Sequence, residues 1–102
     1  MPYHTLWSIF NEIRKESYGA ILEFPEQLPD GSERYRITML LADVDQRQVW
    51  KEYVQFRINP RDDHSIEFEG AKKKFKVWQE NEIMEAVREW IKERIEKKGM
   101  SE

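Results

Sequence analysis

The chain has no cysteine among its 102 residues. This absence excludes a disulfide scaffold, a zinc site built on thiolates and a cysteine nucleophile, and it fits a reducing compartment. Long apolar runs are also missing, because no stretch approaches the roughly 18–20 residues that a membrane-spanning helix needs. The N-terminal segment carries charge where a signal peptide is apolar. We therefore expect a cytoplasmic protein that does not enter a membrane.

Residues that carry chemistry are sparse. The four glycines are scattered, so no glycine-rich phosphate loop is present, and the serines lack a nucleophile-elbow context. Of the two histidines, His4 and His64, only His64 has acidic neighbours, Asp62 and Asp63, which makes this trio a candidate metal site. Turn-forming aspartates in a polar loop explain the same pattern more simply. Glu52 interrupts the apolar face of a predicted strand, and a strand edge that reaches water explains it better than a catalytic acid does. We expect no metal, no cofactor and no enzyme activity.

Charge of both signs and aromatic side chains are plentiful. Charged residues make up 36% of the chain, against about a quarter in a typical domain. Aromatic residues make up 13%, enough to build a core. The length is typical of one domain, which we assign to residues 1–102. The net charge is −3, whereas a protein that binds duplex nucleic acid is usually basic overall.

Two segments have the apolar spacing of amphipathic helices. The first covers residues 5–17, with Thr5 as its N-cap and with charged side chains, Glu12 among them, facing solvent. The second covers residues 82–98, with Gly99 as its C-terminal stop. Their apolar positions are Leu6, Ile9, Phe10 and Ile13 in the first helix, and Ile83, Val87, Trp90, Ile91 and Ile95 in the second.

Between the two helices, apolar and polar residues alternate, which predicts strands. The expected strands are residues 20–24, 34–42 and 47–58, followed by the two arms of a hairpin within residues 65–78. Prolines and turn residues predict a loop over residues 25–32 and a tight turn over residues 43–46. Because each helix has one apolar stripe, we predict an α+β two-layer sandwich. Both helices then lie on one face of an antiparallel sheet of about five strands.

The stretch EGAKKKFKVW, residues 69–78, combines lysines with aromatics and at first suggests a nucleic-acid-binding patch. A two-residue turn at Gly70-Ala71 accounts for most of it, since glycine is favoured at the first position of a II′ turn. The predicted cross-strand pairs are Glu69 with Lys72, Phe68 with Lys73, Glu67 with Lys74, and Ile66 with Phe75. Such pairs contribute roughly 0.2–1 kcal/mol each. The lysines are therefore predicted to form a hairpin arm.

The same alternation places basic and aromatic side chains on the sheet face that the helices leave open. The predicted binding residues on this face are Arg34, Arg36, Tyr53, Arg57, Lys76 and Trp78. Tyrosine, tryptophan and arginine are the usual anchors of protein interfaces, so we predict a non-enzymatic module that binds a protein partner or forms a homodimer. The alternative is a single-stranded nucleic-acid binder, in which bases stack on the rings and cations follow the phosphates. A small enzyme with a site near Glu52 or residues 62–64 is the third interpretation.

Overall fold

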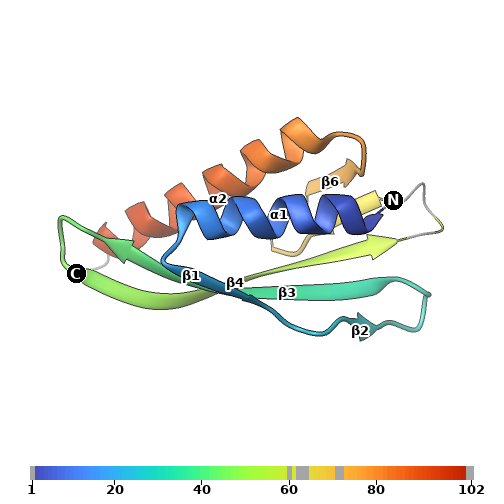
Figure 1. Ribbon diagram of the computed structural model, residues 1–102, viewed down its shortest axis with the longest axis horizontal. Coiled ribbons are helices and arrows are strands. Elements are labelled where there is room, and N and C mark those ends of the chain that lie inside the picture. The colour runs from blue at the N-terminus through green and yellow to red at the C-terminus, as the bar shows by residue number, and fades with distance from the viewer. Residues whose placement is uncertain (1, 60, 62–64, 71–72, 101–102) are drawn as a thin grey trace.

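The computed structural model describes residues 2–59, 61, 65–70 and 73–100. The elements are α1 (Pro2–Glu16), β1 (Gly19–Leu22), β2 (Glu26–Gln27), β3 (Glu33–Asp43), β4 (Gln48–Asn59), β5 (Ser65–Phe68), β6 (Lys73–Lys76) and α2 (Glu80–Met100). The strands form one antiparallel sheet in the order β1-β3-β4-β5-β6, and β2 also pairs with β3. Both helices lie on the same face of this sheet (Figure 1). The predicted α+β sandwich is confirmed.

The long β3–β4 hairpin is the centre of the sheet, with eleven residue pairs in register. Its tip is the predicted turn, in which the Asp43 carboxylate accepts hydrogen bonds from the N–H groups of Asp45 and Gln46 at 3.1 and 3.3 Å. Arg47 follows with a φ of 53°, in the left-handed region. The turn therefore closes through a side chain that satisfies two backbone donors.

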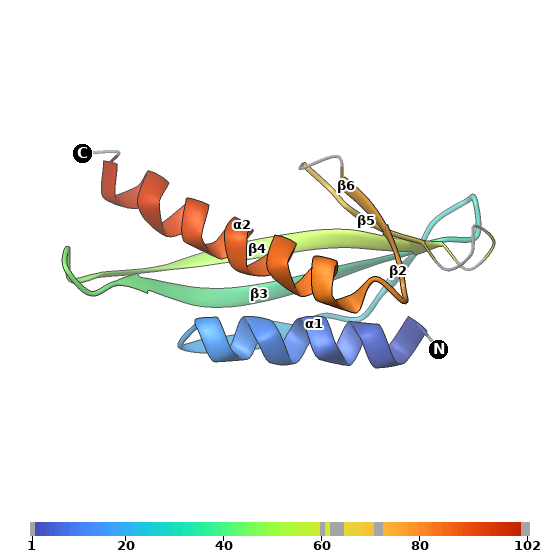
Figure 2. The ribbon, with the colours of Figure 1, turned by 90° about the horizontal axis from the view of Figure 1, so that it is seen from above.

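The other strands flank only parts of this ladder. β1 pairs with residues 37–40 of β3, whereas β2 pairs with its first two residues, Glu33 and Arg34. β5 pairs with the last four residues of β4, and β6 adds beyond β5. Seen from above, α2 runs obliquely over the sheet, and the β5–β6 hairpin diverges from α2 (Figure 2). The two ends of the ladder therefore have different neighbours.

The core lies between the helices and the sheet. The predicted helix stripes are confirmed, because Leu6, Ile9 and Ile13 of α1 and Ile83, Val87 and Ile91 of α2 are buried. Phe10, Trp90 and Ile95 pack at the margins of the core. Aromatic rings of four neighbouring strands form a row across the sheet. The ring centroids are 5.8 Å apart for Tyr35–Phe56, 5.5 Å for Phe56–Phe68 and 6.1 Å for Phe68–Phe75.

The first helix differs from its prediction in two respects. It begins at Pro2 rather than at Thr5, which agrees with the preference of proline for the first helical turn. Thr5 is buried inside the helix, and its hydroxyl donates to the carbonyl of Val77 at 3.2 Å. Glu12 was predicted to face solvent, but it is buried and accepts a hydrogen bond from Arg88 of α2 at 2.9 Å. The reason is that α2 packs along this side of α1, which the sequence of α1 alone does not reveal.

The second helix is longer than predicted at both ends. It begins at Glu80, because the N–H of Ile83 donates to the carbonyl of Gln79 at 3.0 Å. It continues through Gly99 to Met100, so the predicted stop at Gly99 is wrong. Gly99 is not among the glycines with positive φ, which a left-handed helix stop would need.

Within the hairpin, three of the four predicted pairs are confirmed, namely Phe68 with Lys73, Glu67 with Lys74, and Ile66 with Phe75. The fourth pair includes Lys72, which lies outside the described residues. In the predicted loop over residues 25–32, the short strand β2 was missed. Its backbone pairs with β3 because Leu28 and Ser32 close a turn, with a backbone bond of 3.0 Å.

Candidate functional site

The open face of the sheet holds most of the predicted binding residues. Arg34 lies directly opposite Arg57, and Arg36 and Tyr53 follow on the same two strands. Lys76 lies on this face two strands away, on β6, where it pairs with Ser65. Trp78 is exposed but follows the end of β6, in the segment that turns toward α1. The structure therefore brings four of the six residues together and separates Trp78 from them.

One part of this face, which we call the charged end, consists of Arg34, Arg57, Glu67 and Glu69. Arg34 Nε lies 2.7 Å from Glu69 Oε1, and its Nη1 lies 2.7 Å from Glu26 Oε1. Arg57 Nη2 lies 3.1 Å from Glu67 Oε2. The hydrogen bonds from Arg34 to Glu69, and then to Glu26, raise the pKa of the Arg34 guanidinium. The two arginines are thus neutralised by carboxylates of β2, β5 and the turn after β5.

Arg36 links the charged end to Tyr53. Its Nε and Nη2 donate to Gln55 Oε1 at 3.1 and 2.9 Å, and its Nε lies 3.6 Å from a Glu23 carboxylate oxygen. The Gln55 amide nitrogen in turn donates to Glu69 Oε2 at 3.1 Å. The Arg36 guanidinium also lies over the Tyr53 ring, 4.6 Å from its centroid. One side of the Tyr53 ring is therefore covered by a cation that is itself paired.

The other part of the open face, the apolar end, consists of Ile21, Leu40, Val49 and Tyr53. These side chains are 67%, 39%, 66% and 54% exposed, respectively. Thr38 pairs with both Ile21 and Tyr53, so these residues form a row across β1, β3 and β4. Facing and diagonal neighbours in an antiparallel sheet lie about 4.5–8 Å apart, so Ile21, Val49 and Tyr53 each lie diagonally beside Leu40. The exposed Lys51 lies opposite Leu40, between Val49 and Tyr53.

Leu40 and Val49 are not among the predicted binding residues. Both occupy outward positions in the alternation, where an open sheet face normally has polar residues. Leu40 comes between the buried Met39 and Leu41, and the continuous apolar run hides its orientation. Comparing each outward position with the expected polarity would have identified both residues.

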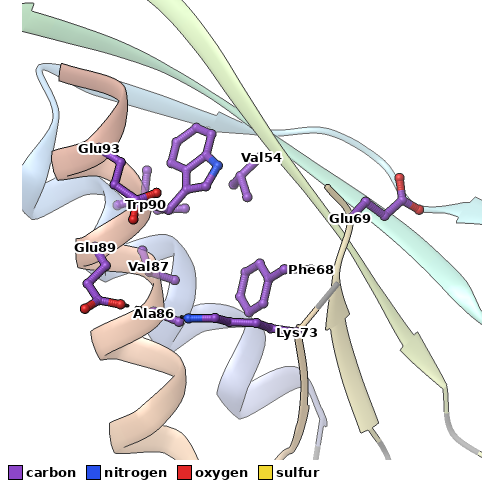
Figure 3. A pocket seen from close by; sticks show the side chains of 10 residues that line it. Val54, Phe68, Glu69, Lys73, Ala86, Val87, Glu89, Trp90 and Glu93 are labelled. Carbon is purple, nitrogen blue, oxygen red and sulfur yellow. Dashed lines mark ion pairs between the residues drawn. The ribbon is translucent and has the colours of Figure 1, made fainter. Parts of the chain in front are cut away.

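A cavity of about 120 Å³ opens on the opposite face, between α2 and the β5–β6 hairpin. Its apolar walls come from Ile13, Val54, Phe68, Ala86, Val87 and Trp90, and its charged rim from Lys73, Glu89 and Glu93. Glu69 also borders the cavity, but its side chain points away from it (Figure 3). In Figure 3, Trp90 and Val54 face each other above Phe68, and Lys73 reaches across to α2. The Lys73 Nζ lies 3.9 Å from Glu89 Oε2. The cavity is apolar inside and charged at its mouth.

The part of the chain that the structure describes holds no cluster of three or more histidine and acidic residues suited to a metal. The trio Asp62, Asp63 and His64 lies outside the described residues. Glu52 is half-buried and accepts the indole N–H of Trp50 at 3.1 Å, so it has a structural partner beside the strand edge. No helix within the described ranges has the length and apolar character needed to span a membrane.

Comparison of the chain with protein-family models, with curated proteins and with solved structures finds no match.

Proposed function

We propose that this chain is a protein-binding module that uses the apolar end of its open sheet face. The observation that carries the proposal is the exposure of four large hydrophobic side chains, of which Ile21, Val49 and Tyr53 lie diagonally around Leu40 on three adjacent strands. Single exposed apolar residues are common on protein surfaces, but contiguous patches mark interaction sites. A partner protein or a second copy of the chain would remove this patch from water, which is the main driving force for association.

The charges of the same face favour a protein over a nucleic acid. Phosphate binding draws on lysines and arginines that can release counterions. The three arginines of the face, Arg34, Arg36 and Arg57, each have a carboxylate within 3.6 Å. Base stacking needs open rings, and Arg36 lies over the ring of Tyr53.

The proposal is tested with Val49→Asp, which places a charge in the apolar end. Val44→Asp is the matched control, because Val44 is also largely exposed but lies in the turn outside the patch. Light scattering over a range of concentrations reports self-association, and affinity capture on the immobilised chain reports other partners. We expect Val49→Asp, but not Val44→Asp, to reduce the mass or the captured partner, with the same thermal midpoint for both variants.

If neither substitution changes the mass or the captured proteins, the apolar end is not the binding surface. Salt-sensitive binding of a single-stranded oligonucleotide that Arg36→Ala weakens would support the nucleic-acid alternative instead.

A further inference from the structure

Strand β4 has an edge that the rest of the described sheet does not fill. The carbonyl of Gln55 accepts from the N–H of Glu69 at 3.0 Å, so the backbone groups of Gln55 point toward β5. Backbone direction alternates along a strand, so the N–H and C=O groups of Val49, Lys51 and Tyr53 point the same way. β5 pairs only with the last four residues of β4, and none of the described backbone bonds reaches these three residues on that side. On the left of Figure 1 no other segment lies below this part of β4.

The cavity beside Trp90 lies next to this edge, on the helix side of the sheet. Val54 of β4 and Phe68 at the end of β5 both line it, so it opens where β5 leaves β4. Its volume of about 120 Å³ approaches that of an apolar cavity that holds a benzene molecule, about 150 Å³. A residue of an added strand opposite Val54 would project its side chain into this space, since facing residues in a sheet share a face.

Further along the same edge the surface becomes basic. Arg94, Lys97 and Lys98 of α2 line a shallow depression together with Glu52. These are three cations around one carboxylate. In a strand added to this edge, the residue opposite Glu52 lies two positions from the residue opposite Val54. Both side chains therefore point to the same face, and the one opposite Glu52 would meet these cations.

We propose that this edge binds an extended peptide segment of a partner, which adds as an antiparallel strand to β4. The segment carries an apolar residue for the Trp90 cavity and, two residues toward its C-terminus, an acidic residue for the Arg94 and Lys97 cluster. Its backbone pairs with Val49, Lys51 and Tyr53, as in other cases of strand addition. The inference goes beyond the proposed function, because it assigns the backbone edge and a sequence pattern rather than the apolar end.

A second copy of the chain fits this edge less well than a peptide does. The antiparallel register that pairs all three of Val49, Lys51 and Tyr53 with a second β4 is centred on Lys51. It places Lys51 directly opposite Lys51 of the other copy, and like charges in that position destabilise a sheet. An acidic peptide has the opposite charge to this edge, so charge complementarity favours it.

The probe for the test is a blocked, fluorescent heptapeptide of threonines with leucine at its first position and glutamate at its third, so that residues 2, 4 and 6 face Tyr53, Lys51 and Val49. Binding is followed by fluorescence anisotropy with the full chain. We expect saturable binding, and slower amide hydrogen exchange at Val49, Lys51 and Tyr53 when the peptide is bound. One control exchanges leucine and glutamate, and another carries N-methyl groups on the amides that pair with β4. Each control should weaken binding at least about tenfold.

Variants of the chain test each part of the site. Ala86→Leu fills the cavity, and Lys97→Glu reverses a charge of the basic cluster; each should weaken binding about tenfold or more. Lys92→Glu, an exposed lysine of α2 outside this cluster, is the matched control and should leave binding unchanged. Lys51→Pro removes one outward N–H of β4 and should weaken peptide binding. The N-methylated peptide tests the same backbone pairing without any change in the protein.

Three results would overturn the inference. One is the absence of binding at about 1 mM peptide, and another is equal binding of the methylated peptide. The third is a dimer of the unmodified chain that Lys51→Pro dissociates, since it would assign the edge to a second copy. Val49→Asp, with Val44→Asp as its control, tests the proposed function separately, so either idea can fail while the other stands.

Discussion

The two ends of the β3–β4 ladder are built on the same pair of strands but differ in their surroundings. At the charged end, β2 and β5 flank the pair on both sides, and their carboxylates reach Arg34 and Arg57. At the other end, β1 flanks β3, but β4 has no neighbour on its outer side among the described residues. There the open face carries the exposed side chains of the apolar end beside Lys51, and the outward backbone groups of Val49, Lys51 and Tyr53 have no partner among the described residues.

This difference indicates a division of roles along one strand pair. Charged groups that are already paired with each other gain little from a partner, because a partner would have to desolvate or replace those pairs. Exposed apolar groups and unpaired backbone groups gain from being covered. We therefore propose that the charged end mainly stabilises the fold, and that binding takes place at the apolar end and the adjacent edge.

The largest expected effect comes from Phe56→Ala at the charged end. Phe56 is fully buried behind this end, between the rings of Tyr35 and Phe68. Its truncation should lower the free energy of unfolding by about 3–5 kcal/mol, measured by chemical denaturation. Tyr53→Ala on the same strand removes an exposed ring, so its effect on unfolding should stay within about 0.5 kcal/mol. Equal losses for the two variants would contradict the division of roles.

A smaller effect is expected for Glu69→Ala. Glu69 accepts from Arg34 and Gln55, and without it Arg34 and Arg57 face each other across the strands with one carboxylate fewer. We expect the thermal midpoint to fall by a few degrees at low ionic strength and by less at high salt, because salt screens the repulsion. Glu23→Ala removes a single, longer ion pair to Arg36 and should have a smaller effect. A Glu69→Ala variant as stable as the parent would show that the network does not stabilise the charged end.

The smallest effect concerns pH and the turn before β3. The Ser32 hydroxyl and then the Ser32 N–H donate to Asp30, at 2.5 and 3.0 Å, and both lower the pKa of the Asp30 carboxyl. A lowered carboxyl pKa stabilises the fold above the ordinary value of 3.8, and this contribution is lost as the pH falls through the folded-state pKa.

The Asp30→Asn variant should therefore melt below the parent at neutral pH, and the difference should shrink as the pH drops below 3.8. Melting curves across this range check the prediction, with Asp45→Asn in the hairpin turn as the control. A difference in melting temperature between Asp30→Asn and the parent that grows on acidification would contradict the prediction.

Much of the fold could be predicted because its signals are local. The apolar stripes of both helices, the turn at residues 43–46 and three hairpin pairs follow from residue spacing within single segments. Element boundaries were less accurate, since α2 continues through Gly99. The strand β2 was missed because its two residues carry no alternation of their own and pair with β3 only after the turn closes.

The candidate site was predicted only in part. The alternation of apolar and polar residues along the strands placed Arg34, Arg36, Tyr53 and Arg57 on one face, as the structure has them. It did not show that glutamates from other strands pair with the arginines, nor that Leu40 and Val49 join Tyr53 in a patch. Trp78 was grouped with this face by extending the alternation past the end of β6, where the chain turns away.

The sequence by itself determined the faces of each element, because the periodicity of a helix or strand is set by its own backbone. The tertiary structure decided which charges meet, as in the burial of Glu12 against Arg88, and where β5 leaves β4. These outcomes depend on segments far apart in the chain, whose distances no local pattern encodes. The edge of β4 that the described strands leave open and the cavity beside Trp90 are therefore properties of the assembled fold alone.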